Sequence, residues 1–150
     1  MNSHAAQSLQ RLETLQRLAA QQEDTAARQL ADALAKHANA QDRYTELLQY
    51  ELEYSARTPV ASGVQALTYQ AGFLSKLRDA VRFQTERVES FAAEVDRTRL
   101  RWLGLHREVE KLEQLAVNAQ RQIDVVENRR SARELDELAQ RGWSRQRVSS

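Results

Sequence analysis

The sequence contains no cysteine, one proline and four glycines among its 150 residues. Without cysteine, disulfide bonds, thiolate metal sites and cysteine nucleophiles are all excluded. Turns depend on proline and glycine, so the chain has few places where it can reverse direction. Aromatic residues make up only 6% of the chain, which is low for a compact globule of this size. These absences favour long helices over a globular domain.

Long apolar runs and an excess of one charge are missing as well. No segment approaches the roughly 20 apolar residues of a membrane span, and residues 1–10 do not resemble a signal peptide. The 22 basic and 21 acidic residues leave a net charge of +1, which gives no general reason to bind nucleic acid or an anionic membrane. We therefore expect a soluble, cytoplasmic protein that binds no nucleic acid and does not insert into a membrane.

Motifs that carry catalysis are also lacking. The sequence has no phosphate-binding loop, nucleophile elbow, zinc-protease motif or glycine-rich dinucleotide turn, so we expect neither an enzyme nor a cofactor. His106 and Glu110 are four residues apart on one helix face and could begin a metal site. A metal needs further ligands, and we interpret the two residues as a solvated pair.

What the chain has in abundance is residues that favour helices, chiefly Ala, Leu, Gln, Glu and Arg. One break interrupts them, where Pro59 and Gly63 stand close together, and proline cannot continue a helix from its N-terminal side. A short connection between two long helices makes them antiparallel neighbours. We predict a single domain with a helix over about 5–56, a turn over about 57–63, a helix over about 64–138 and a disordered tail over about 142–150.

A heptad repeat in the second predicted helix identifies the face that packs. Nine residues spaced by seven are all apolar: Leu67, Leu74, Val81, Val88, Val95, Trp102, Val109, Ala116 and Ile123. The positions three residues later are apolar in six of nine cases. A strict seven-residue repeat predicts a left-handed supercoil with a partner helix. The predicted fold is therefore all-α, with two long helices that form an antiparallel coiled-coil hairpin.

An apolar and aromatic patch is predicted beside the turn. Leu47, Tyr50 and Tyr54 form a second apolar face at the end of the first helix, and residues at helical spacing near the start of the second helix match it: Phe73, Leu77 and Ala80. In a hairpin these two stripes meet. They either thicken the core at the hairpin tip or form a docking patch for a partner protein, a role for which tyrosine is well suited.

Three blocks of the sequence resemble the FliJ family of flagellar export proteins. They are LLQYELEY (47–54), TYQAGFLSKLRDAV (68–81) and ENRRSARELDELAQR (127–141). Their order and spacing match the family over nearly the whole chain. Ala71 and Gly72 stand where the family often has glutamine or larger residues, and the N-terminal segment departs most from the family pattern.

The resemblance implies a stalk-like component of the flagellar type III export apparatus, at the inner face of the cell membrane, that promotes protein export, motility and chemotaxis. Its implied partners are the export ATPase FliI and the export gate protein FlhA, with FliH and export chaperones as further candidates. Gate binding is implied for Leu47, Tyr50, Tyr54, Phe73, Leu77 and Ala80, and two further family positions fall on Arg43 and Gln84. Contact with the ATPase ring is implied for Arg129, Arg133, Asp136, Glu137 and Arg141.

Two alternative functions stay open at the level of sequence. One is the corresponding stalk of a virulence-type secretion system. The other is a generic structural coiled-coil adaptor that dimerises through the part of the second helix beyond residue 115.

Overall fold

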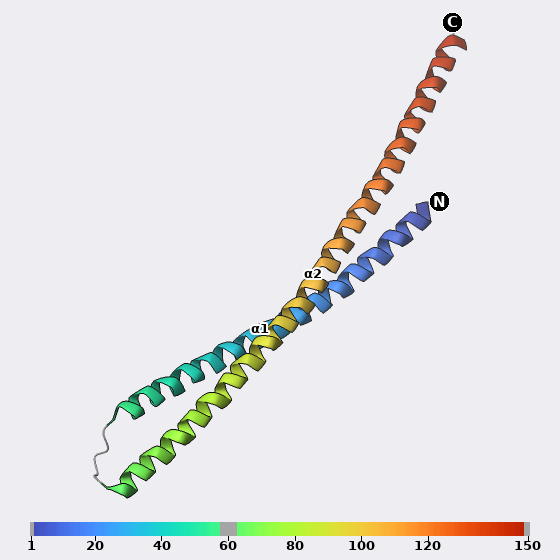
Figure 1. The fold of residues 1–150 in the computed structure, drawn as a ribbon. Helices are drawn as coiled ribbons and strands as arrows, with labels where there is room; N and C mark the ends of the chain where they lie inside the picture. The colour runs from blue at the N-terminus through green and yellow to red at the C-terminus, as the bar shows by residue number, and fades with distance from the viewer. Residues whose placement is uncertain (1, 58–62, 149–150) are drawn as a thin grey trace. The chain divides into compact units, whose positions relative to one another are not determined.

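The computed structural model describes residues 2–57 and 63–148, and these form two helices. Helix α1 spans Asn2–Ala56 and helix α2 spans Val64–Val148 (Figure 1). No strand occurs among the described residues, and the predicted all-α hairpin of two long helices is confirmed. Most of the predicted turn, with Pro59, lies outside the described residues.

The chain divides into two units, each containing a piece of both helices. The terminal unit combines the residues up to Glu23 with those from Leu105 onward, and the turn unit is Asp24–Gly104. Within the turn unit, α1 and α2 run antiparallel on either side of the connection (Figure 1). The single domain expected from the sequence stays a prediction.

The second helix is longer than its sequence pattern indicated. We predicted that it ends near residue 138 and that a disordered tail begins near 142, but α2 continues to Val148. The extension contains no proline, and Gly142 is its only strong helix breaker. Arg145 and Arg147 lie in the last turn, where positive charge favours the helix dipole. The last part of α2 has few apolar residues, so the sequence shows no heptad pattern there, although the helix continues.

The predicted heptad face of α2 is the face that packs on α1. Val95, Val109 and Leu112 are buried, and the other members are half-buried except at the two ends. Leu67 and Val126 are 57% and 53% exposed, which corrects their assignment to the packed face. A two-helix seam covers a side chain from one direction only, and for the same reason the large ring of Trp102 is half-buried.

On α1 the matching face is a strict seven-residue repeat of alanine, which the sequence analysis did not identify. The buried residues recur every seven positions: Ala19, Ala26, Ala33 and Ala40, at 7, 2, 1 and 4% exposure. Alanine lets the backbones approach closely, so the larger side chains of α2 fill the seam. Small residues on one helix and large ones on the other make the two faces complementary.

Gln84 is the single buried polar residue of the described chain, at 6% exposure. Its side-chain amide donates a hydrogen bond to the backbone carbonyl of Ala40, at 3.0 Å. The bond is possible because alanine leaves the α1 backbone accessible at that position. A satisfied polar group inside a coiled-coil seam favours one register over its neighbours.

Candidate functional site: the groove beside the turn

An apolar groove lies next to the turn, between the end of α1 and the start of α2. Its volume is about 370 Å³, which is enough for one or two side chains of a partner. It is lined by Tyr50, Glu53, Tyr54, Arg57, Phe73 and Leu77. Four of the six residues predicted to bind the export gate therefore line one groove.

An aromatic contact between the two helices forms the floor of this groove. The ring centroids of Tyr54 and Phe73 lie 4.5 Å apart, and the ring planes are tilted by 47°. Such a tilted pair contributes about 0.5–1.5 kcal/mol beyond its buried area. Phe73 nevertheless stays 44% exposed and Tyr50 62% exposed. The aromatic residues thus bridge the helices and still present apolar surface to solvent.

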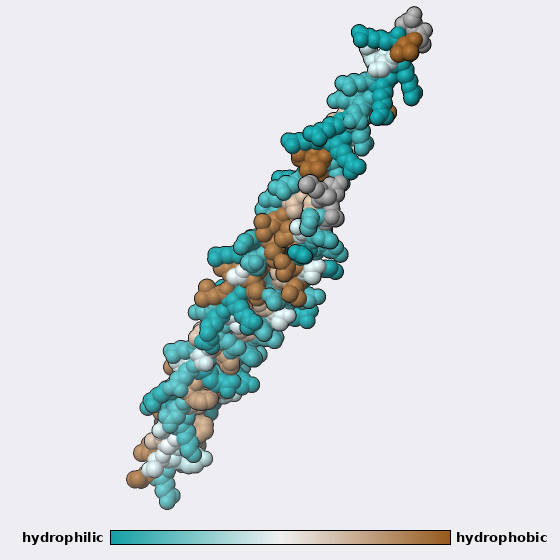
Figure 2. Space-filling view, turned by 90° about the vertical axis from the view of Figure 1, so that its right-hand side faces the viewer, coloured by the Kyte–Doolittle hydropathy of each residue, from teal (hydrophilic) through white to brown (hydrophobic). Residues whose placement is uncertain are grey.

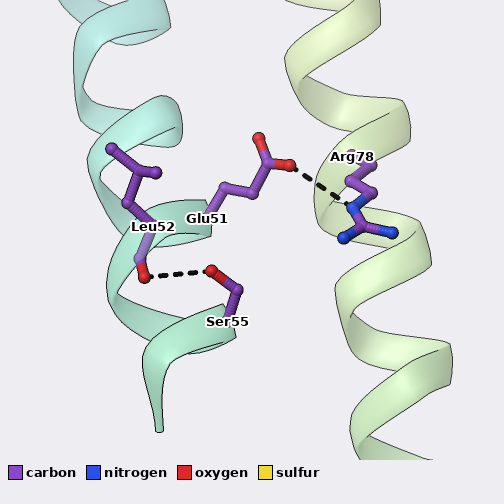
Figure 3. Close-up of polar contacts among 4 residues, drawn as sticks. All are labelled: Glu51, Leu52, Ser55 and Arg78. Carbon is purple, nitrogen blue, oxygen red and sulfur yellow. Dashed lines mark hydrogen bonds and ion pairs between the residues drawn. The ribbon is translucent and has the colours of Figure 1, made fainter.

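Polar contacts hold the two helices at this separation. Gln70 on α2 donates its amide to the carbonyl oxygen of Arg57, at 3.1 Å. The guanidinium of Arg78 pairs with the Glu51 carboxylate, with 3.4 Å between Nε and Oε1 (Figure 3). Figure 3 also shows Ser55, whose hydroxyl donates to the Leu52 carbonyl at 3.1 Å. Hydrogen bonds and an ion pair therefore hold together the two helices that form the groove.

The other residues named from the sequence lie deeper or differ in role. Leu47 and Ala80 are half-buried in or beside the seam, so they support the groove rather than line it. Gln84 is buried against Ala40 and presents no surface for a partner. Glu53 and Arg57 line the groove although no apolar pattern could single them out. Only their spacing would have indicated them, because Glu53 follows Tyr50 by three residues and Arg57 follows Tyr54 by three.

The residues predicted to contact the ATPase ring lie on α2 of the terminal unit. Arg129, Arg133, Glu137 and Arg141 follow at spacings of four residues and so share one face of the helix. These residues and Asp136 are all exposed. Figure 2 shows the C-terminal part of α2 as largely hydrophilic with isolated apolar side chains. An exposed helix face with charges of both signs provides groups for ion pairing and little apolar area.

A second set of polar contacts joins the helices in the terminal unit. His106 Nδ1 lies 2.7 Å from a carboxylate oxygen of Glu23 on α1, and His106 Nε2 lies 3.1 Å from one of Glu110. The spacing of His106 and Glu110 was evident in the sequence, whereas Glu23 was not identified. No group of three or more metal-binding side chains occurs in the described ranges 2–57 and 63–148.

The fold defines a class of protein, a hairpin of two long helices with an exposed apolar groove beside its turn. The family model of the flagellar FliJ protein matches residues 7–148, and the chain belongs to the FliJ family. This family supports a role in flagellar protein export as a structural component. Comparison with curated proteins and with solved structures gives no match. Across the described residues, neither helix is long and apolar enough to span a bilayer.

Proposed function

We propose that this protein is a stalk of the flagellar export apparatus that docks on the export gate through its turn-end groove and contacts the export ATPase through α2. Membership of the FliJ family supports the apparatus. The groove carries the gate assignment, because exposed Tyr50 lies beside the Tyr54–Phe73 pair at an apolar opening.

The chemistry of the two surfaces suits two different partners. The groove offers tyrosine and phenylalanine rings and the guanidinium of Arg57. Aromatic residues and arginine are enriched at protein interfaces. The exposed charges of Arg129, Arg133 and Arg141 form ion pairs worth only ~0–1 kcal/mol each. Such weak pairs can exchange within a ring, while the groove holds the gate more firmly.

Promotion of export and motility follows from this arrangement, with the protein held at the inner face of the cell membrane through the apparatus. FlhA and FliI are the principal partners in the proposal, and FliH and export chaperones are further ones. The same surfaces would serve a virulence-type system, but the family that matches is flagellar.

The test is the affinity for the soluble domain of FlhA, measured by calorimetry. Tyr50→Ala alone removes an exposed groove residue, and Tyr50→Ala with Tyr54→Ala also removes the aromatic floor. Loss of two interface anchors of ~2 kcal/mol each weakens binding by roughly 700-fold. Tyr69 is 77% exposed and does not line the groove, so Tyr69→Ala is the matched control. Equal affinities for all variants, with helicity retained, would rule out the groove.

A further inference from the structure

One histidine in the terminal unit bridges two carboxylates from two helices. Its Nδ1 approaches Glu23 of α1 at 2.7 Å, and its Nε2 approaches Glu110 of α2 at 3.1 Å. A carboxylate only accepts hydrogen bonds, and a neutral imidazole has a single N–H to donate. Both contacts of His106 can therefore be hydrogen bonds only when the ring is protonated on both nitrogens.

The charged groups around the ring favour that protonated state. From α1 it faces Glu23, and the next acidic residue of α1, Asp24, pairs with Arg28 at 2.9 Å. From its own helix it faces Glu110, one turn further on. The hydrogen bond that His106 donates to Glu23 is the largest cause that raises the pKa of His106 above its ordinary value. Desolvation opposes this shift, and the charges of Glu110 and Glu23 add to it.

The apolar packing around this contact is small. The buried core of the terminal unit consists of Ala19, Val109 and Leu112, with Leu12 packed against it. Glu23 follows Ala19 by four residues, and its side chain is only 22% exposed. A carboxylate so close to the seam needs a cationic partner, because an unpaired charge there loses hydration without compensation. The charge state of His106 therefore contributes to the pairing of the helices in this unit, beside the small apolar core.

The turn unit contains the same contact with a different base. Glu23 and Glu51 are four heptads apart on α1, and His106 and Arg78 are four heptads apart on α2. Arg78 and Glu51 form the corresponding ion pair (Figure 3). A guanidinium stays charged at every physiological pH, whereas an imidazole does not. Equivalent positions thus hold one pH-independent and one pH-sensitive pair.

We propose that Glu23, His106 and Glu110 form a pH-sensitive clasp, which holds the first part of α1 on α2 when the imidazole is protonated and loosens when it is not. Loss of a proton leaves one ring nitrogen as an acceptor facing a carboxylate, so one hydrogen bond becomes a repulsion. The clasp thereby makes the pairing of the two helices in the terminal unit depend on pH.

The direction of the dependence follows from the raised pKa. Pairing is fully supported below the ordinary histidine pKa of about 6.5. The support is lost as the pH rises through the higher pKa that His106 has when the helices are paired. Each unit by which pairing raises that pKa corresponds to about a tenfold change in the pairing equilibrium. A measured pKa therefore predicts the size of the structural response.

The test uses distances between spin labels. Because the chain has no cysteine, Gln10→Cys with Val117→Cys labels two exposed positions of the terminal unit, one on each helix. We expect double electron–electron resonance to show one short distance at about pH 5.5 and a growing longer population towards about pH 8.5, because the imidazole loses its proton as the pH rises. Asn39→Cys with Ser90→Cys, exposed positions of the turn unit, should show no change.

Two substitutions separate the clasp from general effects of pH. His106→Arg copies the Arg78–Glu51 pair and should keep the short distance at every pH. Glu23→Gln should lower the pKa of His106, read from its ring nitrogens by NMR, and move any transition to lower pH. The clasp is refuted if the wild-type distances do not change with pH, or if the His106→Arg variant changes as the wild type does.

Discussion

At the scale of single residues, the alanine repeat on α1 sets how closely the helices approach. Ala33 is 1% exposed and Ala26 is 2% exposed, so their methyl groups are enclosed by the partner helix. The seam opposite them carries β-branched and aromatic side chains, including Val95 and Phe91. Close-packed interiors have no spare volume for added methylene groups. Replacing one of these alanines by a larger residue therefore measures how tightly the seam is packed.

We expect Ala33→Leu to destabilise the hairpin by about 1–3 kcal/mol, because the larger side chain must separate the helices. For a chain of this length the unfolding temperature would fall by roughly 2–4 °C per kcal/mol. The matched control is Ala35→Leu, at an exposed position two residues on, where we expect a change within about 0.5 kcal/mol. Thermal unfolding followed by circular dichroism distinguishes them, and equal stabilities would mean that the seam has free space.

His106 shows, also at the scale of single residues, how the type of base determines whether an ion pair depends on pH. Arg78 makes a permanent pair with Glu51, while His106 makes its pair with Glu23 conditional on protonation. The difference lies in the chemistry of the base and not in its place on the heptad, because both bases precede a seam position by three residues, Val81 and Val109. A change of one residue can therefore alter the pH response without altering the fold.

At the scale of the element, α2 is continuous over 85 residues although it contains three interior glycines, Gly72, Gly104 and Gly142. A Cβ atom built at any of these positions meets nothing within 4 Å. Gly104 is exposed and lies next to half-buried Leu105 of the terminal unit. Glycine in a helix interior costs roughly 0.5–1 kcal/mol relative to alanine. At Gly104 this cost is not offset by a closer packing contact.

We expect Gly104→Ala to stabilise the protein by about 0.5–1 kcal/mol, because alanine restricts the unfolded chain and fits the helix without a clash. Gly142→Ala is the matched control, since Gly142 lies where every residue of α2 from 124 to 148 is exposed. It should raise the helical signal of the C-terminal end while the unfolding temperature stays the same. A destabilised Gly104→Ala variant would show that the position needs the freedom of glycine.

At the scale of the whole molecule, packing and exposed charge occupy different stretches of the chain. The buried residues fall between Ala19 and Leu112, whereas 127–148 is exposed throughout. Stability should therefore reside in the hairpin, and the C-terminal part of α2 should be free to contact a partner. This separation lets folding and function be tested independently.

We expect a chain truncated after Val126 to keep the unfolding temperature of the full-length protein, because every residue from 127 to 148 is exposed. The same truncation should abolish stimulation of the export ATPase, measured by phosphate release. A chain truncated after Arg141 keeps the five candidate ring contacts and should stimulate normally. If the shorter chain folds and still stimulates the ATPase, the ring contact lies elsewhere.

The sequence by itself determined the all-α hairpin, the packed face of α2 and the stripes beside the turn. Heptad spacing specifies which side of a helix is buried, and proline with glycine marks where the chain reverses. These are local properties, so residues such as Val95, Tyr54 and Phe73 could be assigned from their spacing alone.

Only the tertiary structure decided which residues lie opposite one another. The pairing of Glu23 with His106, the bond from Gln84 to Ala40 and the place of Arg57 in the groove depend on the register between the helices. Register is set by the connection and by the summed fit of the whole seam, and no single spacing along one helix encodes it. For this reason the sequence placed His106 beside Glu110, and only the folded hairpin brought Glu23 to the other side of the ring.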